Sequence, residues 1–297
     1  MSVRDFLRAV GIDDLDAFDA AAKWAATATA TDRRRLTIPL GHRVCGDQVI
    51  DELWHLSLSD GPDAHLAVSG RTGSGRSTLL RAMALSLAAC YGPDRVGLAF
   101  VDLFGGATFA GMENLPHVRD GRAPRAVRDL LDWLDAELRM RERYGVRTDL
   151  VVFIDETVHL SVPEQSVETL SAFSELAKRA SWLGVHLVWG SESHTRAGTR
   201  GALDNFGSRC VLSVSDRQCA LDMVGVDDPF TAPVGQLCGW FRSAGPWTAR
   251  QLVMLNANAP LHAAVRDDGV AAPSQGDALL QRLVCAAPYQ PRFTVAR

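Results

Sequence analysis

The segment from Gly70 to Ser77 has the residue types and the spacing of a phosphate-binding loop. It reads G-R-T-G-S-G-R-S and fits the pattern G-x-x-x-x-G-K-[ST], except that Arg76 stands where the pattern has lysine. Glycines let successive backbone N–H groups turn toward a polyphosphate at the positive end of a helix dipole. The Ser77 hydroxyl would be a ligand of Mg²⁺. The segment therefore predicts a site for ATP and Mg²⁺; the alternative is a Gly- and Ser-rich turn without a ligand. The predicted nucleotide-binding residues of this segment are Gly70, Thr72, Gly73, Ser74, Gly75, Arg76, Ser77 and Thr78.

An acidic pair follows about 80 residues later. The run from Leu150 to Ile154 is apolar, as in a buried strand, and Asp155 and Glu156 come directly after it. Asp155 fits the acid that holds a Mg²⁺-bound water, and Glu156 fits the base that polarises the attacking water. Ser77 and Asp155 are therefore the predicted Mg²⁺ residues, and Asp155 and Glu156 the predicted catalytic residues.

The elements that must position these residues alternate between strand and helix from about residue 64 to 214. Two further strands are expected near 237–241 and 248–254. Such alternation predicts an α/β fold with a mainly parallel sheet flanked by helices. In the alternating region, strands are predicted at 64–69, 97–102, 150–154, 185–190 and 209–214, and helices at 77–91, 124–144, 166–182 and 216–223.

The two ends of the chain have patterns of their own. A short helix is expected from Ser2 to Gly11, an amphipathic helix from Asp14 to Trp24, and an Ala/Thr linker at 25–31. Leu36 to Leu40, which contains Pro39, is typical of an edge strand. A last helix is expected to carry Leu279, Leu280, Leu283 and Val284 on one face, where they either dock a partner or pack on the domain itself. We divide the chain into a helical lead-in with a first strand (1–55), a nucleotide-binding domain (56–256) and a C-terminal tail with a short helix (257–297).

Composition sets limits on the function. With 297 residues, 47% of them hydrophobic and 22% charged, the chain can bury a large core, which excludes wholesale disorder. The net charge of −4 argues against a protein that coats nucleic acid. Lysine occurs only at Lys23 and Lys178, so Arg76 partly reflects a general preference for arginine.

The cysteines and the absence of long apolar runs bear on location. Six cysteines without a C-x-x-C pair are expected to be buried free thiols in a reducing cytosol. No stretch reaches the about 20 apolar residues of a membrane span, and no signal peptide is evident. We therefore expect a cytoplasmic protein without membrane insertion. Core packing is expected for Trp182, Trp189, Trp240 and Trp247, and structural roles for His65, His117, His159, His186 and His194.

The segment Asp102–Val118 is distinctive and reads D-L-F-G-G-A-T-F-A-G-M-E-N-L-P-H-V. It resembles the segment D-F-K-G-G-A-T-F-x-G-x-x-x-L-P-H-V of FtsK/SpoIIIE-type ATPase domains, closest to those of the EccC motor proteins of type VII secretion. Leu183–Ser193 is similar to the sensor strand of that family, L-G-V-H-L-L-L-A-S-Q-R, and Leu36–Gly41 to its R-V-P-I-G strand. The resemblance covers roughly residues 5–255. It implies a RecA-like P-loop NTPase fold with ATP and Mg²⁺ as cofactors.

The chain departs from this family pattern around the expected nucleotide. Arg76 replaces the lysine of the phosphate loop, and Phe104 replaces a family lysine. Glu192 and Ser193 occupy the Gln-Arg pair of the sensor strand, which places Glu192 among the predicted nucleotide-binding residues. Asp129 falls where an arginine finger is expected, although Arg125 and Arg128 are one turn and one residue away. Since a finger is worth about 10³–10⁵ in turnover, the resemblance implies a site that binds nucleotide better than it cleaves it.

These observations favour an ATP-binding, weakly hydrolysing motor domain that acts as a stand-alone or regulatory subunit in a type VII secretion-like system. Its partners would be other motor ATPase subunits, copies of itself, or a secreted WXG-type substrate peptide. A DNA-translocating FtsK-like ATPase is the first alternative, which the acidic net charge disfavours. A pseudo-ATPase whose groove accepts a helical peptide is the second.

Overall fold

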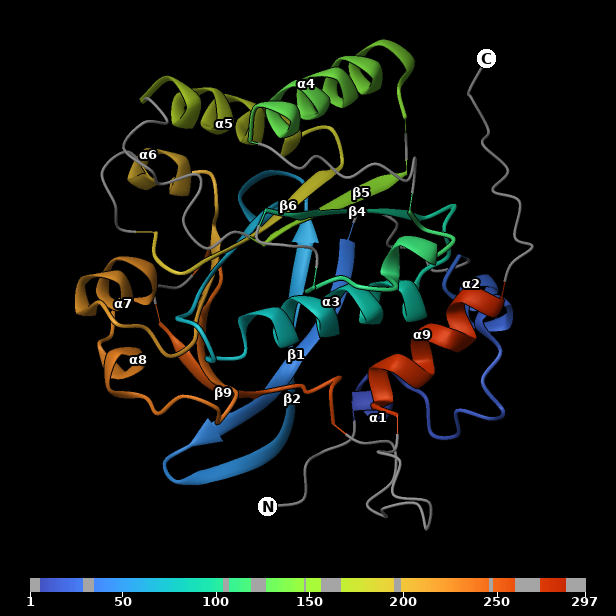
Figure 1. Ribbon diagram of the computed structural model, residues 1–297, viewed down its shortest axis with the longest axis horizontal. Helices are drawn as coiled ribbons and strands as arrows, with labels where there is room; N and C mark the ends of the chain where they lie inside the picture. The colour runs from blue at the N-terminus through green and yellow to red at the C-terminus, as the bar shows by residue number, and fades with distance from the viewer. Residues whose placement is uncertain are drawn as a thin grey trace.

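One mixed sheet runs through the described part of the molecule, and helices cover both of its faces (Figure 1). The computed structural model describes residues 6–28, 35–103, 107–118, 127–146, 148–155, 167–194, 199–245, 248–259 and 273–286. Within these ranges the sheet has nine strands in the order β2-β1-β9-β8-β7-β3-β6-β5-β4. The strands are β1 (Arg35–Cys45), β2 (Gln48–Ser59), β3 (Leu66–Ser69), β4 (Val96–Asp102), β5 (Asp149–Asp155), β6 (Val185–Ser191), β7 (Ser208–Val211), β8 (Cys238–Arg242) and β9 (Arg250–Met254).

The parallel half of the sheet brings the candidate residues together. Strands β7, β3, β6, β5 and β4 pair in parallel, whereas β8, β9, β1 and β2 extend the sheet through antiparallel pairings. In the parallel register Ser69 pairs with Ser191, and Asp155 with Gly190. The loop after β3 and the acid at the end of β5 therefore lie at the same, carboxyl edge of the sheet. The predicted, mainly parallel α/β fold is confirmed.

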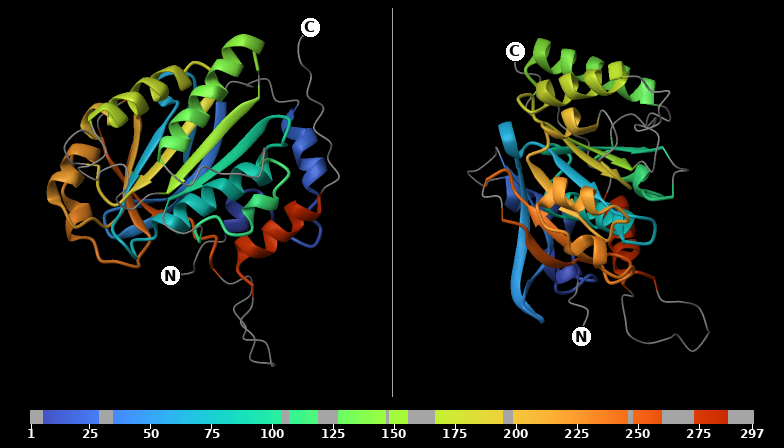
Figure 2. Two further views of the ribbon diagram at one scale, coloured as in Figure 1. Left: turned by 45° about the horizontal axis from the view of Figure 1, so that its top comes forward. Right: turned by 90° about the vertical axis from the view of Figure 1, so that its left-hand side faces the viewer.

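Two layers of helices flank the sheet, because alternate residues of each strand point to opposite faces. Leu66 and Val68 belong to the core cluster that contains α3, α9 and the N-terminal helices, whereas Ala67 belongs to the cluster that contains α4, α5 and α7. Figure 2 shows α4 and α5 on one side of the sheet and the red α9 on the other. The helices are α1 (Phe6–Ala9), α2 (Ala20–Ala28), α3 (Arg76–Cys90), α4 (Val127–Tyr144), α5 (Val167–Ala180), α6 (Thr199–Leu203), α7 (Arg217–Val224), α8 (Asp228–Thr231) and α9 (Gln275–Cys285).

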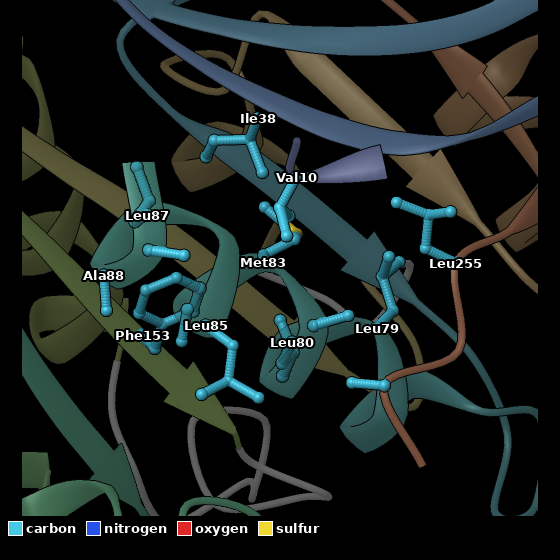
Figure 3. Packing of buried hydrophobic residues seen from close by; sticks show 14 of the residues in the cluster. Val10, Ile38, Leu79, Leu80, Met83, Leu85, Leu87, Ala88, Phe153 and Leu255 are labelled. Atoms are coloured by element: carbon cyan, nitrogen blue, oxygen red, sulfur yellow. The ribbon is translucent and has the colours of Figure 1, made fainter. Parts of the chain in front are cut away.

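Helix α3 lies at the centre of the first cluster. Its residues Leu80 and Met83 pack with Phe153 of β5, Ile38 of β1 and Leu255 (Figure 3). The helix is apolar on most of its surface because the sheet covers one side and α2 and α9 cover much of the other. This burial fixes the position of the N-terminus of α3, where the candidate loop ends.

The apolar faces of both chain ends are buried in this same cluster. The buried residues are Phe6, Leu7 and Val10 near the N-terminus, and Leu279, Leu280 and Leu283 of α9. Arg81 Nη2 of α3 donates to Asp277 Oδ1 of α9 at 2.7 Å. Of the two alternatives for these faces, the structure thus supports packing on the domain itself. The division of the chain at residues 55 and 256 stays a prediction.

Three sequence predictions about the N-terminal region were wrong. Strand β2 was missed, because its apolar alternation is interrupted by the exposed Asp51 and Glu52. Strand β1 is not an edge strand, since it lies between β2 and β9. Pro39 is tolerated because it pairs only with β2, next to a bulge, and the pairing with β9 begins at Gly41. Residues 25–28 continue α2 rather than forming a linker.

Side-chain burial also corrects two predictions. Trp189 and Trp240 are in the core as expected, but Trp182 is 70% exposed, and Trp247 lies outside the described residues. All six cysteines are free thiols, but Cys45 and Cys285 are exposed. The described histidines of the predicted structural set, His65, His117, His186 and His194, are buried as expected, and His159 lies outside the described residues. In the described ranges, no helix combines the length and the apolar character of a membrane span.

The packing of α9 predicts the effect of a core truncation. Leu279→Ala removes a fully buried side chain and should lower the free energy of unfolding by about 2–5 kcal/mol. Gln281→Ala, on the exposed side of the same helix, should change it by less than about 0.5 kcal/mol. Urea denaturation of the two variants measures the difference, and equal effects would show that α9 does not pack on the core.

Candidate nucleotide-binding site

The candidate loop connects β3 to α3 and is held by the ends of neighbouring strands. Gly70 N donates to Ser191 O at 3.1 Å, and Arg71 N donates to Ser213 O at 2.9 Å. Within the loop, Ser74 N donates to Arg71 O at 3.0 Å. The predicted strand–loop–helix arrangement is therefore present, and the loop lies at the N-terminus of a 15-residue helix.

Two glycines of the loop have backbone conformations that favour glycine. Gly75 has φ +95° and is the N-cap of α3, and Gly73 has φ +79°. A Cβ on Gly75 would lie 2.1 Å from Leu237 Cδ2, and one on Gly73 would lie 3.0 Å from Val234 Cγ1. The segment before β8 thus covers part of the loop, a contact that the sequence analysis did not predict. The orphan N–H groups of the first turn of α3 provide the positive end of the helix dipole that binds phosphate.

Arg76, at the position of the pattern's lysine, is turned back into the protein. Its guanidinium is buried, and Nε donates to Asp155 Oδ1 at 2.9 Å. Nη1 donates to the carbonyl oxygen of Gly70 at 2.7 Å. The cation therefore ties the first turn of α3 to the end of β5 and to the start of the loop.

Asp155 accepts hydrogen bonds on both carboxylate oxygens. Besides the Arg76 bond at Oδ1, Oδ2 accepts from Ser77 Oγ at 3.0 Å and from Thr108 Oγ1 at 2.6 Å. The Thr108 backbone N–H also donates to Asp102 Oδ2, at the end of β4, at 3.1 Å. The sequence analysis had noticed the distinctive segment that contains Thr108 but had given this residue no role.

Whether Mg²⁺ fits this site depends on how many acceptor positions of the Asp155 carboxylate are free. A carboxylate has about four lone-pair positions, and three protein donors already occupy Asp155. The positive charge of Arg76, whose Nε lies 2.9 Å from Asp155 Oδ1, also neutralises the carboxylate. Mg²⁺ requires near-octahedral oxygen ligands, commonly carboxylates and waters. As it is arranged, the Asp155 carboxylate fits a guanidinium partner and does not fit the predicted Mg²⁺ role, whereas Ser77 donates its hydroxyl hydrogen and keeps its oxygen lone pairs.

The remaining predicted residues fall in several places. Thr72 is exposed on the loop, and Thr78 Oγ1 accepts a hydrogen bond from Asn258 Nδ2 at 3.2 Å. Glu192 follows β6 directly and is therefore at the same edge of the sheet, half-buried. Asp129 is exposed in the first turn of α4. Glu156 and Phe104 lie outside the described residues, so their predicted positions are not placed.

A buried histidine supports the base of the loop. His194 Nδ1 and Ser69 Oγ are hydrogen-bonded at 2.6 Å, directly before Gly70. Burial lowers the pKa of His194 to about 3, with smaller contributions from the charges of Arg76 and Arg209. The imidazole is therefore neutral at physiological pH, so it positions the loop without adding charge.

A separate pocket of about 470 Å³ opens at the opposite, amino edge of the parallel strands. Its lining includes the exposed Trp182 before β6, Arg209 of β7 and Arg242 at the end of β8. Arg209 donates to the backbone carbonyls of Leu203, Phe206 and Asp222. Burial lowers the pKa of Arg242, and the charge of Arg209 lowers it further. The pocket lining thus combines an exposed aromatic side chain with two arginines and the acidic Asp204.

Several known proteins are similar to this chain in sequence. The FtsK/SpoIIIE family model matches residues 21–146. The ESX-5 secretion system protein EccC5 of Mycobacterium tuberculosis is 28% identical over 278 residues, which cover 82% of this chain and 20% of that protein. This chain spans a fifth or less of the length of the curated relatives that it matches.

Solved structures show the same fold. The cytoplasmic domain of the type VII secretion ATPase EccC of Thermomonospora curvata matches with a TM-score of 0.76 and 22% identity, over 95% of this chain and 34% of that one. A structure of ATPases 2 and 3 of the same EccC in complex with a signal sequence peptide matches with a TM-score of 0.65 and 21% identity, over 89% of this chain and 49% of that one. The predicted P-loop fold is thereby confirmed.

The buried pair of Arg76 and Asp155 predicts a large effect on stability. Asp155→Asn leaves a buried guanidinium without its counter-charge, which should lower the free energy of unfolding by about 3–5 kcal/mol. The double variant Asp155→Asn with Arg76→Met also removes the unpaired guanidinium and should recover part of the lost free energy of unfolding. Glu52→Gln breaks the exposed pair with Arg43 and should cost at most about 1 kcal/mol. Urea denaturation compares the variants; an Asp155→Asn loss no larger than that of Glu52→Gln would contradict the pairing.

Proposed function

We propose that this chain, which is an FtsK/SpoIIIE-type P-loop domain related to the EccC proteins of type VII secretion, binds ATP and hydrolyses it slowly. It would act as a stand-alone or regulatory subunit beside catalytically complete motor ATPases of a type VII secretion-like system. One observation carries the proposal: an intact phosphate loop at the N-terminus of α3 is combined with an arginine that pairs with Asp155.

The loop geometry supports nucleotide binding. Gly73 and Gly75 have positive φ values, and the loop precedes a long, buried helix, so N–H donors and the helix dipole converge on one place. The backbone bonds of Gly70 and Arg71 to the neighbouring strands hold the loop before a ligand binds. Such preorganisation lowers the entropic cost of binding.

The side chains around the loop support slow hydrolysis. Rapid phosphoryl transfer requires cations placed where charge develops on the γ-phosphate. Arg76 instead donates to Asp155 and Gly70, and the finger position holds the exposed Asp129. The roles predicted for Glu156 as base, for Glu192 beside the nucleotide, and for Ser77 as a Mg²⁺ ligand stay predictions, whereas the bonds of Asp155 disfavour its predicted Mg²⁺ role.

The proposed partners follow from the relatives. EccC of Thermomonospora curvata was solved in complex with a signal sequence peptide. We propose other motor ATPase subunits, further copies of this chain, or a secreted WXG-type peptide as partners, and a cytoplasmic location like that of the solved EccC domain. DNA translocation gains no support from the described residues or from the net charge of −4.

A peptide-binding pseudo-ATPase is the second candidate function. The pocket with Trp182 on its rim favours it, because exposed aromatic side chains are common anchors of protein interfaces. In that case the loop beside α3 would be structural, and a peptide rather than ATP would stabilise the fold.

Thermal unfolding tests ATP binding. ATP at about 100 times its Kd should stabilise the protein by about 2.7 kcal/mol, which raises Tm by a few degrees. Thr72→Asp places a carboxylate on the exposed loop and should abolish most of this rise, whereas Gln48→Asp, with the same charge change on the remote β2, should keep it. No rise at millimolar ATP in the parent protein would reject ATP binding and favour the second candidate.

Turnover by the purified chain tests slow hydrolysis. Release of phosphate should stay well below about 1 s⁻¹, the low end of typical kcat values, because Arg76 stays bound to Asp155 and the finger position holds Asp129. Glu156→Gln should then change the rate little, as should the control Glu175→Gln on the exposed side of α5. Rapid turnover that collapses with Glu156→Gln alone would contradict the proposal.

A further inference from the structure

We propose that Arg76 is the resident cation of this site and that the nucleotide phosphates bind without Mg²⁺. This inference rests on the proposed function, since it concerns how the same loop takes its nucleotide. The guanidinium would stand between Asp155 and the phosphates, where a divalent ion bridges carboxylate and phosphate in other phosphate-transfer sites.

The first step is that Arg76 is fixed in place before any ligand binds. Its side chain is 8% exposed and that of Asp155 is 6% exposed, so water screens their attraction little. Bonds to Asp155 Oδ1 and to Gly70 O set the guanidinium plane. Because Gly70 belongs to the phosphate loop itself, the cation is adjacent to the backbone that would surround the phosphates.

The second step is that the sheet has room for the larger cation. A Cβ on Gly190 of β6 would lie 3.3 Å from Arg76 Cδ and 2.9 Å from Leu80 Cδ1, so alanine would crowd the arginine stem. Gly190 falls where the sensor-strand motif quoted above has alanine. Glycine at 190 therefore leaves room for both the Leu80 and the Arg76 side chains, and an alanine there would meet Leu80 Cδ1 first.

The Arg76 guanidinium has hydrogen-bond donors left for a phosphate. Two bonds leave further N–H donors on the guanidinium, which has more donors than the Nε and Nη1 hydrogens used here. Arginine stays charged at all relevant pH values, is weakly hydrated, and matches phosphate oxygens in a forked geometry. It can therefore donate to a phosphate while keeping its bond to Asp155.

The bonds of Asp155 also oppose the binding of Mg²⁺ at its carboxylate. Arg76 balances the charge of Asp155, and Ser77 and Thr108 occupy its other oxygen. A divalent ion at this site would find the charge of the Asp155 carboxylate already neutralised. It would also be repelled by the Arg76 guanidinium, and this repulsion is strong because water screens buried charges little. Binding of Mg²⁺ there would first require the buried pair to open.

Calorimetric titration of the full chain with ATP, once with excess Mg²⁺ and once with EDTA, tests the inference. The affinity should be at least as high in EDTA as in Mg²⁺. Arg76→Lys combined with Gly190→Ala rebuilds the motif's residues and should make binding at least tenfold tighter with Mg²⁺ than in EDTA. Arg81→Lys, the same change five residues further along α3, should keep the metal-independent behaviour.

If the double variant does not fold, titration of the unsubstituted chain is sufficient to test the inference. Binding that is tenfold or more tighter with Mg²⁺ overturns the resident-cation inference and leaves the proposed ATP binding intact. Absence of ATP binding in both conditions rejects the proposed function and the inference with it. Equal or tighter binding in EDTA supports both.

Discussion

The buried ion pair between Arg76 and Asp155 is the interaction on which the arrangement of this site depends. It joins the first turn of α3 to the end of β5, and the bond to Gly70 O adds the start of the loop. A buried pair is stable only when both charges remain together and their other donors and acceptors are satisfied. Ser77 and Thr108 complete the set at Asp155, so a single carboxylate joins β5, the first turn of α3 and the segment of Thr108.

Local pattern was sufficient to predict most of the parallel half of the fold. Strand–helix alternation and the glycine spacing placed β3, the loop and α3 correctly, because both signals come from residues adjacent in sequence. Strand β2 was missed because the exposed, adjacent Asp51 and Glu52 lie on opposite faces of the strand and interrupt its apolar alternation. The contact of Leu237 with Gly75 has no local signal, since it joins residues far apart in the chain.

The sequence shows that residue 76 is an arginine, but it does not show in which direction the side chain points. The sequence alone indicated a missing γ-phosphate cation. The structure shows a cation that is present, with its hydrogen bonds turned to Asp155 and Gly70. This orientation depends on space beside Gly190 and on acceptors in two places, the end of β5 and the start of the loop, and such relations follow only from the folded arrangement. Thr108 was overlooked for the same reason, although its segment stood out.

The nucleotide loop and the pocket at the opposite edge share supporting strands, which constrains how either one is interpreted. Strand β8 begins next to Leu237, which lies against Gly75, and ends at Arg242, which lines the pocket. The pocket residue Arg209 is the second residue of strand β7, which leads to Ser213, whose carbonyl accepts from Arg71 of the loop. A substitution in the pocket that shifts either strand will therefore also shift the loop. For this reason peptide and nucleotide binding must be measured on the same variants before an effect is assigned to one edge.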